Sequence, residues 1–264
     1  MRVLFIVGLL VLFLLLVIAG FAVKLAVKLY RNRQEPFDSA KHALVSDAVM
    51  NVIKLPGGHI LFVPTTRGAH PRGTPQKEHG VAYLPGALVN HLAYAPLCRE
   101  IARLSNLPVL LVRATLRMTP LAKRSIASAL ETHATTAQVT SWVLGGHSLG
   151  GITATQLIDL PSVYALFLHG AYPEFPVKEL PVLQVLAEHD SILNAEKVAK
   201  AKALYMPAAA VSHVIAGGNH AGFGLYGPQR FPKPDGERTI TLAEQQLQVA
   251  QTTADWLRTL VHAE

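Results

Sequence analysis

The sequence predicts an α/β domain, built as a mostly parallel sheet flanked by helices, that follows one N-terminal transmembrane helix. Three observations lead to this prediction. An uncharged run of 21 residues extends from Val3 to Val23. Farther along, strand-like and helix-like segments alternate, which is the pattern of a parallel sheet covered by helices. Half of the 264 residues are hydrophobic and only 16% are charged, so the chain can bury a large core.

The uncharged run is long enough to cross a bilayer. As a helix it would rise about 30 Å, the thickness of the hydrocarbon core. A cleaved signal peptide has a shorter apolar region, of about 7–15 residues, followed by a small-x-small cleavage site, and no Ala-x-Ala follows this run. We therefore expect residues 1–30 to form an uncleaved membrane anchor that inserts through residues 3–23. Residues 31–41 are then a linker, and residues 42–264 form a single domain.

The side of the membrane on which this domain lies stays open. Arg2 flanks the run on one side, and Lys24, Lys28, Arg31 and Arg33 flank it on the other. The positive-inside rule favours a cytoplasmic domain. However, apolar and basic residues alternate at helical spacing between residues 21 and 30, which would also suit an interfacial extension of the anchor.

The net charge of +7 does not indicate a nucleic-acid partner. Residues 1–41 hold six basic and two acidic side chains, so +4 of the charge belongs to the anchor and its flank. Cys98 is the single cysteine, which excludes an internal disulfide and a cysteine-based zinc cluster. No metal or organic cofactor is implied.

After the linker, apolar runs and turn residues predict eight strands and several helices. Pro56-Gly-Gly joins the first two strands as a hairpin, and the polar stretch 65–79 reads as an open connection. The predicted strands are 49–55, 59–64, 81–84, 109–112, 141–144, 164–168, 182–187 and 211–216. The predicted helices are one capped by Asn90, then 125–135, 152–160, 195–204 and 242–260.

A motif for a nucleophilic serine lies between a predicted strand and a predicted helix. Gly146-His-Ser148-Leu-Gly150 matches Gly-x-Ser-x-Gly. The serine must sit on a strained strand-to-helix turn to project its hydroxyl, and neighbouring side chains would clash there, so glycines flank it. A chance match is expected roughly 0.1 times in a chain of this size. The flanking strand and helix, which the motif requires, favour the functional interpretation.

The order of the chain suggests the serine's partners. In enzymes with this turn an acid and then a histidine follow, each after a later strand. His220 lies in the glycine-rich loop 217–222 after the last strand, and Asp190 follows strand 182–187. Asp190 would orient the His220 imidazole and stabilise its protonated form. Glu188 and Glu174 are alternative acids, whereas we interpret His147 and His169 as structural.

Two backbone amides are candidates for binding a developing oxyanion. The N–H of Leu149 follows the serine and begins the next helix. A second donor usually comes from the loop after the third strand, which is Leu84-Pro-Gly-Ala-Leu-Val-Asn. There we choose the N–H of Ala87, with Leu88 as the alternative. The residues that line the substrate pocket are not identified by the sequence.

These motifs resemble the α/β-hydrolase superfamily, and most closely a subgroup of short, lidless, often membrane-tethered hydrolases related in fold to dienelactone hydrolases. The resemblance runs from about Leu44 to the C-terminus. It rests on Leu44-Val-Ser-Asp, Tyr83-Leu-Pro-Gly, Tyr94-Ala-Pro-Leu, Gly145-Gly-His-Ser-Leu-Gly-Gly, Gly217-Gly-Asn-His-Ala-Gly-Phe-Gly and Tyr226-Gly-Pro-Gln. It implies the α/β-hydrolase fold and the same catalytic residues: Ser148, Asp190 and His220.

Two departures limit what the resemblance implies. Dienelactone hydrolases use a cysteine nucleophile, so their substrate is not carried over to a chain with Ser148. Relatives also have a second glycine at the position of Ala87, where a left-handed backbone would strain an alanine.

The expected activity is cleavage of a carboxylic ester, lipid-like or otherwise small, through an acyl-enzyme on Ser148. A thioesterase, acyltransferase or peptidase would use the same triad, and a catalytically silent hydrolase-fold scaffold is the alternative from another class. The sequence does not reveal the physiological substrate or the oligomeric state.

Overall fold

The computed structural model describes residues 2–66, 79–177 and 179–262. The chain divides into two compact units, residues 1–33 and residues 34–264. The first unit is essentially one helix, α1 (Arg2–Arg31). Within it, Leu10–Arg31 is long and apolar enough to cross a membrane, and none of its most apolar stretch is buried. A signal sequence would meet the same criteria of length and composition.

The second unit is built on an eight-stranded sheet in the order β1-β2-β4-β3-β5-β6-β7-β8. The strands β3 to β8 run parallel, and β2 is antiparallel to both β1 and β4. Their bounds are β1 (Met50–Lys54), β2 (Ile60–Pro64), β3 (His79–Leu84), β4 (Val109–Leu111), β5 (Ser141–His147), β6 (Val163–His169), β7 (Val182–Ala187) and β8 (Val211–Ile215). The motif strand, β5, lies between β3 and β6 in the middle of the sheet.

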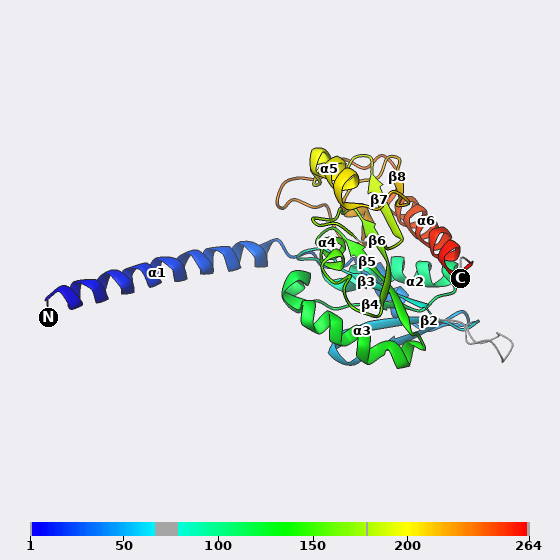
Figure 1. Ribbon diagram of the computed structural model, residues 1–264, viewed down its shortest axis with the longest axis horizontal. Coiled ribbons are helices and arrows are strands. Elements are labelled where there is room, and N and C mark those ends of the chain that lie inside the picture. Colours follow the sequence, from blue (N-terminus) through cyan, green and yellow to red (C-terminus); the bar gives the residue numbers. More distant parts are fainter. Residues whose placement is uncertain (1, 67–78, 178, 263–264) are drawn as a thin grey trace. The chain divides into compact units, whose positions relative to one another are not determined.

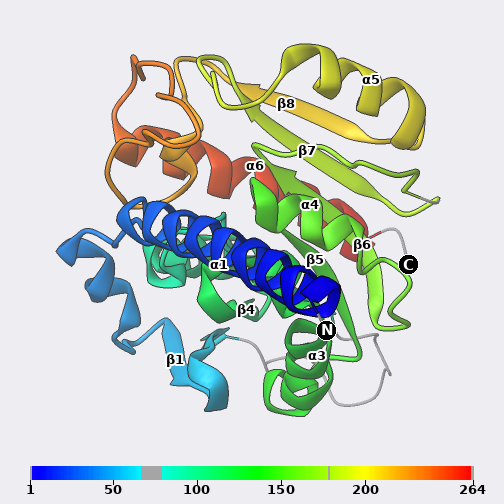
Figure 2. The same ribbon diagram turned by 90° about the vertical axis from the view of Figure 1, so that its left-hand side faces the viewer.

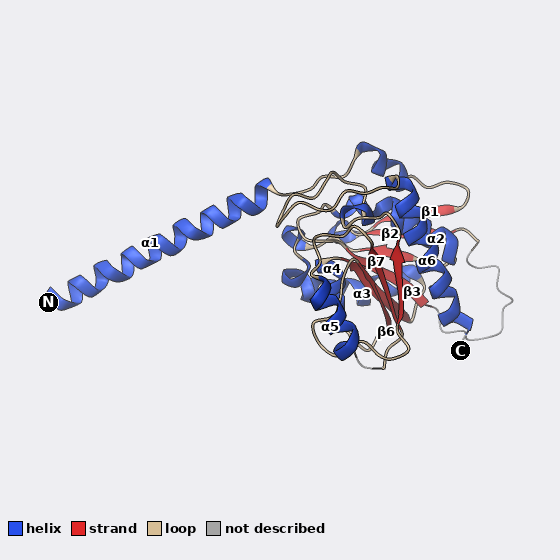
Figure 3. Ribbon diagram, turned by 90° about the horizontal axis from the view of Figure 1, so that it is seen from above, coloured by secondary structure: helices blue, strands red, loops and turns tan. Residues whose placement is uncertain are grey.

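Helices cover both faces of this sheet. The helices are α2 (Ala95–Ser105), α3 (Lys123–Ala137), α4 (Leu149–Thr155), α5 (Ala195–Tyr205) and α6 (Leu242–His262). Within the second unit, α2 and α6 lie on one face, while α3, α4 and α5 lie on the other (Figures 1 and 3). On the second face α4 packs over β5 and β6 (Figure 2).

Each face of the sheet has its own apolar core. On the α2/α6 face, Tyr83 and Phe167 from the strands pack with Ile101 of α2 and Leu257 of α6. On the other face the fully buried Trp142 of β5 is the largest side chain. Because the inner parallel strands are covered on both faces, they are apolar almost without interruption rather than alternating, whereas β8 at the edge of the sheet is mostly exposed.

All eight predicted strands form, with ends that differ by up to three residues. The open connection predicted at 65–79 lies mostly outside the described residues, although its last residue, His79, already belongs to β3. Asn90 does cap a helical turn: its side chain accepts the N–H of Leu92. That turn is a short 3₁₀ segment, His91–Tyr94, and α2 begins after it at Ala95.

One helix differs clearly from its prediction. We expected a helix over 152–160, but α4 begins directly after the serine at Leu149 and ends at Thr155. The hydroxyl of Thr153 donates to the carbonyl of Leu149, and that of Thr155 donates to the carbonyl of Ile152. Threonine hydroxyls that compete for backbone carbonyls weaken a helix, which is consistent with its early end.

The segment expected to be a linker, residues 31–41, joins the second unit from Gln34 onward. Gln34 forms a parallel bridge with Val89, and Pro36 forms an antiparallel bridge with Tyr226. A 3₁₀ helix then runs over Asp38–Leu44 and buries Ala40 and Ala43. These residues are therefore part of the domain's structure rather than a free connection.

Candidate active site

Ser148 occupies the sharp turn between β5 and α4. Its backbone has φ 52° and ψ −123°, a conformation that an L-residue adopts only under strain. The N–H of Ser148 donates to the carbonyl of His169 at the end of β6, at 2.9 Å, which helps to hold the turn. The side chain is partly exposed. A strained turn that presents a serine at the carboxyl end of a central strand is the geometry of a nucleophile elbow.

The two glycines of the motif are required by close packing against β3. A Cβ atom on Gly146 would overlap the carbonyl oxygen of Leu84, and a Cβ atom on Gly150 would overlap the same oxygen. Because that oxygen belongs to the backbone, it cannot move aside as a flexible side chain could. Any larger residue at either position would push the elbow away from the end of β3.

His220 and Asp190 form a buried pair at the same edge of the sheet. Asp190 follows β7, and His220 follows β8. The Nδ1 atom of His220 lies 2.7 Å from Oδ2 of Asp190, and their side chains are 0% and 4% exposed. The other carboxylate oxygen, Oδ1, accepts the N–H groups of Ile192 and Leu193. The Asp190 carboxylate is thus fixed by three hydrogen bonds, with one oxygen committed to His220.

The imidazole ring of His220 lies close to the serine turn. The imidazole rings of His220 and His147 are 4.5 Å apart between centroids, and His147 immediately precedes Ser148. In the described part of the chain, the buried Nε2 of His220 has no hydrogen-bond partner. The structure therefore brings Asp190 and His220 together beside the elbow but does not join His220 to the Ser148 hydroxyl. Such bonds often tighten only when substrate binds.

The alternative acids lie elsewhere. Glu188 accepts the N–H of Gly217 with Oε2 at 2.7 Å, so it supports the loop that carries His220. Its side chain is more than half exposed. Glu174 is exposed on the connection between β6 and β7. Neither carboxylate contacts the His220 imidazole among the described interactions.

Two residues that hold His220 in place were missed by the sequence reasoning. Gln245 of α6 is fully buried, and its side-chain amide binds both backbone groups of Asn219: Oε1 accepts the N–H and Nε2 donates to the carbonyl. Asp235 accepts the N–H of Ala221 at 2.8 Å. Hydrogen bonds to Asn219 and Ala221 therefore hold the backbone on both sides of His220. A polar residue on the apolar stripe of the closing helix was the signal for Gln245.

The two proposed oxyanion donors are both unengaged amides. Leu149 is the first residue of α4, where N–H groups have no helical acceptor. Neither its N–H nor that of Ala87 has an acceptor within the described parts of the chain. The alternative, Leu88, is excluded because its N–H already donates to the carbonyl of Arg117 at 2.8 Å. Leu88 also adopts the left-handed conformation that we considered for Ala87, with φ 62°.

A buried network fixes the residue before Ala87. The N–H of Gly86 donates to the Tyr94 hydroxyl at 3.1 Å, and that hydroxyl lies 2.8 Å from Nδ1 of His147. Burial lowers the pKa of His147 well below its ordinary value, so the ring is neutral and can accept the Tyr94 proton. We interpreted His147 as local packing, but it also links the elbow to the loop 85–90.

The remaining buried histidine at this edge is structural. His169 is fully buried, with Nε2 2.9 Å from the Thr253 hydroxyl and Nδ1 3.3 Å from the Tyr83 hydroxyl. Burial lowers its pKa to about 3. Phe223 is fully buried and stacks on the rings of His147 and His169. It therefore supports the site from within.

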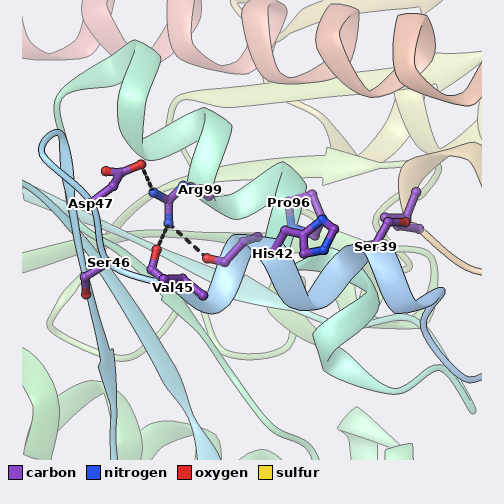
Figure 4. A pocket seen from close by; sticks show the side chains of 9 residues that line it. Ser39, His42, Val45, Ser46, Asp47, Pro96 and Arg99 are labelled. Carbon is purple, nitrogen blue, oxygen red and sulfur yellow. Dashed lines mark hydrogen bonds and ion pairs between the residues drawn. The ribbon is translucent and has the colours of Figure 1, made fainter.

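A separate pocket of about 430 Å³ involves none of these residues (Figure 4). It lies where the 3₁₀ helix Asp38–Leu44 meets α2. Its most polar side chain, Arg99, donates to the carbonyls of Ala43 and Val45 and to the Asp47 carboxylate. The guanidinium thus ties two parts of the chain together.

Within the described residues, no three His, Cys, Asp or Glu side chains converge as a metal site.

Comparison with known proteins decides the family. The model of the "Alpha/beta hydrolase family" matches residues 80–248, which is more than half of the chain. The chain belongs to the alpha/beta hydrolase family. No curated protein matches its sequence.

Solved structures share the fold of this alpha/beta hydrolase at low identity. A carboxyl esterase from the mycorrhizal fungus Tuber melanosporum is 14% identical, with a TM-score of 0.54 over 85% of this chain and 91% of that one. A dienelactone hydrolase from Anabaena variabilis is 16% identical, with a TM-score of 0.54 over 80% and 97%. An esterase from the archaeon Pyrobaculum calidifontis is also 16% identical, at 0.54 over 83% and 86%. At these identities the comparison shows the fold alone.

Proposed function

We propose that this alpha/beta hydrolase is a membrane-anchored serine esterase that cleaves carboxylic esters through an acyl-enzyme on Ser148. The observation that carries the proposal is the buried His220–Asp190 pair beside the elbow. One nitrogen of His220 is bound to Asp190 at 2.7 Å, and the other has no partner within the described residues. A buried nitrogen without a partner is costly. It is explained if the Ser148 hydroxyl engages it when substrate binds.

The reaction follows from these positions. His220 Nε2 takes the proton of the Ser148 hydroxyl as the oxygen attacks the ester carbonyl carbon. The carbonyl oxygen becomes negative and is stabilised by the N–H groups of Leu149 and Ala87. The intermediate collapses, the bond to the alkoxide breaks, and the alkoxide takes the proton from His220. A water molecule, deprotonated by His220, then attacks the acyl carbon. The bond from that carbon to the Ser148 oxygen breaks, the oxygen takes the proton from His220, and the acid is released.

Asp190 makes His220 effective as the base. Its carboxylate holds the imidazole in the tautomer with a proton on Nδ1, so that Nε2 is free to accept a proton. It also stabilises the imidazolium that forms during each proton transfer. Because Asp190 is itself fixed by the N–H groups of Ile192 and Leu193, the imidazole keeps its orientation between the two half-reactions.

Exposed apolar side chains near the elbow support an ester with a hydrophobic acyl or alcohol group. Leu116 and Leu121 are 64% and 69% exposed. They lie on the segment whose Arg117 bonds to Leu88, the neighbour of the proposed donor Ala87, and whose Thr119 bonds to the proposed donor Leu149 itself. Large apolar side chains left in water beside a catalytic turn suit a substrate that covers them.

The apolar N-terminal helix supports a membrane-borne ester as the substrate class. Its length matches a bilayer, and four basic residues follow its apolar run. The connection between β6 and β7, residues 170–181, has no helix or strand in its described part. This agrees with membership in the short, lidless, membrane-tethered subgroup. The domain boundaries we propose are an anchor over residues 1–30 and a catalytic domain over residues 42–264, onto which residues 34–41 of the connecting segment 31–41 are packed.

The test is ester turnover by the full-length protein in detergent, with p-nitrophenyl esters of increasing acyl length. We expect the wild type to hydrolyse them, with kcat/KM rising with acyl length as more apolar surface is covered. Ser148→Ala and His220→Ala should each lower kcat by about 10⁴-fold or more. Ser125→Ala, a change at an exposed serine on α3 whose hydroxyl bonds only to the carbonyl of Ala122 among the described interactions, is the control and should keep full activity.

Other outcomes separate the alternatives. Turnover of acyl thioesters or of peptides but not of oxygen esters would identify a thioesterase or peptidase with the same triad. Transfer of the acyl group to an added alcohol in preference to water would identify an acyltransferase. A folded wild type that turns over none of these substrates would favour a catalytically silent scaffold and contradict the proposal.

A further inference from the structure

The strained backbone positions of the second unit gather around the active site. In the described chain, six residues other than glycine have positive φ. Asn106 and Gln138 are the left-handed caps that end α2 and α3, an ordinary role. Ser148 is the elbow. The remaining three are Leu88, Leu116 and Arg117, with φ of 62°, 54° and 59°. Strain of this kind persists only where the surrounding contacts enforce it.

These three residues meet at one place. The N–H of Leu88 donates to the carbonyl of Arg117 at 2.8 Å, so the two strained segments are joined directly. The carbonyl of Leu88 accepts the N–H of Gln34 at 2.9 Å. The carbonyl of Gln34 in turn accepts the N–H of Asn90 at 2.9 Å. Both backbone groups of Leu88 are therefore engaged, one by Arg117 and the other by Gln34, which is the first residue of the second unit.

The Arg117 side chain ties the same elements together a second time. Nη1 donates to the carbonyl of Gln34 at 3.0 Å, and Nη2 lies 2.5 Å from Oε1 of Glu35. The other Glu35 oxygen accepts the side-chain amide of Asn90 at 3.0 Å. The Arg117 side chain is only 23% exposed. Arg117 thus binds Leu88 through its backbone and Gln34 and Glu35 through its planar guanidinium, which can make both bonds at once.

Ala87 lies between two anchored residues. On one side, Gly86 is held by the Tyr94 hydroxyl, and on the other, Leu88 is held by Arg117 and Gln34. The Ala87 N–H is left without an acceptor in the described residues. Its direction is therefore set by the anchors on either side.

We infer that Arg117 is a positioning residue that locks the oxyanion loop, residues 85–90, onto Gln34 and Glu35. Gln34 and Glu35, which follow the apolar helix, then help to position the active site in addition to connecting the helix to the domain. This inference rests on the proposed function, because it assigns a purpose to the fixed direction of the Ala87 N–H. A shift of about 1 Å in a donor can cost up to about 100-fold in rate.

The test compares full-length variants by their kcat and KM on the same esters, together with their melting temperature. Arg117→Ala should lower kcat by about tenfold or more, short of the 10²–10³-fold loss when an oxyanion donor is removed outright. KM should stay within about twofold, because the loop binds the transition state and not the ground state. Arg117→Lys should recover part of kcat, since an ammonium makes one of the two contacts but not both.

Glu35→Ala removes the carboxylate that pairs with the Arg117 guanidinium, and Asp38→Ala is its matched control. Asp38 is also an acidic residue of this segment, and it forms an exposed ion pair with Lys41 that touches no part of the loop. We expect Glu35→Ala to lower kcat in the same direction as Arg117→Ala, and Asp38→Ala to leave it unchanged. The melting temperatures of Glu35→Ala and Asp38→Ala should agree within about 2 °C, because exposed ion pairs contribute little to stability.

The inference is overturned if Arg117→Ala and Glu35→Ala keep the wild-type kcat while the wild type is active. It is also overturned if KM rises and kcat does not fall, since that pattern describes substrate binding and not positioning of a donor. An inactive wild type would instead overturn the proposed function, and the inference with it.

Discussion

At the residue scale, Asp190 and Glu188 lie two positions apart after β7 and have different tasks. Asp190 is almost fully buried and contacts His220, whereas Glu188 contacts the backbone of Gly217 and faces solvent. Chain order alone left both carboxylates as candidates. Burial and the 2.7 Å contact to Nδ1 distinguish them.

Asp190→Asn should therefore be far more harmful than Glu188→Gln. The amide in place of the Asp190 carboxylate cannot stabilise the imidazolium and favours the wrong tautomer, so kcat should fall by about 10³–10⁴-fold. Glu188→Gln keeps an oxygen that can accept the Gly217 N–H, and kcat should stay within about threefold. Steady-state kinetics on one ester measures both. Equal losses in the two variants would contradict the assignment of Asp190 as the acid.

At the element scale, α6 supports the loop that carries His220, the proposed base. It presents a buried stripe at helical spacing: Gln245, Val249, Thr253 and Leu257 are all inaccessible. Two of these four side chains are polar. Gln245 binds the backbone of Asn219, and Thr253 binds His169. A helix that reads as a simple amphipathic cover therefore also supports the loop of His220.

Gln245→Leu should destabilise the protein and loosen His220. It leaves the N–H of Asn219 buried without its acceptor, and the carbonyl keeps only the 3.3 Å bond from the N–H of Gly222. The loss of the N–H partner should cost about 1–3 kcal/mol of unfolding free energy. The exposed Gln248, one turn away on the same helix, is the control: Gln248→Leu should change stability by less than about 0.5 kcal/mol. Thermal unfolding compares the two. Equal melting temperatures would show that the Asn219 contacts are not stabilising.

The elements were predictable from the sequence to different degrees. The strands were predicted because apolar runs bounded by proline and glycine are local signals, such as Pro108 before β4 and Gly217 after β8. The predicted end of α4 was wrong, which is consistent with threonine hydroxyls that compete for its carbonyls, and its predicted start lay three residues past the true start at Leu149. The contacts of Gln245 and Arg117 were not predictable, since each joins residues far apart in the chain whose proximity only the fold creates.

At the scale of the whole molecule, buried and half-buried neutral histidines make stability depend on pH. Burial lowers the pKa of His169 to about 3 and the pKa values of His59 and His91 to about 4. In the unfolded chain a histidine titrates at about 6.5. The unfolded state therefore binds more protons below that pH. The stability is fully present above about pH 6.5 and is lost as the pH falls towards the folded values.

Replacing His169 should reduce the stability that the protein loses as the pH falls below about 6.5. Each such histidine contributes up to about 1.4 kcal/mol per pH unit below 6.5. Between pH 7 and pH 5, the drop in melting temperature should be about 4–8 °C smaller for His169→Gln than for the wild type, although the variant melts lower at pH 7. His42→Gln, a change at an exposed histidine, is the control and should keep the wild-type drop. An unchanged drop in His169→Gln would contradict the buried neutral state.

The apolar helix gives a second prediction at this scale. If residues 1–30 are an anchor, the expressed protein should stay in the membrane fraction after an alkaline carbonate wash, and its intact mass should include the whole apolar run. Its length, well above that of a signal peptide's apolar region, is the physical reason. A soluble product whose mass lacks residues 3–23 would identify a cleaved signal sequence instead.

In the proposed mechanism, His220 and Asp190 activate Ser148 for attack on an acyl carbon. Labelling of the full-length protein with a fluorophosphonate, followed by peptide mapping, tests it most directly, because only an activated serine reacts readily. We predict one labelled residue, Ser148, with labelling abolished in Ser148→Ala and strongly slowed in His220→Ala. A folded wild-type protein that is not labelled, or is labelled at another residue, would contradict the account.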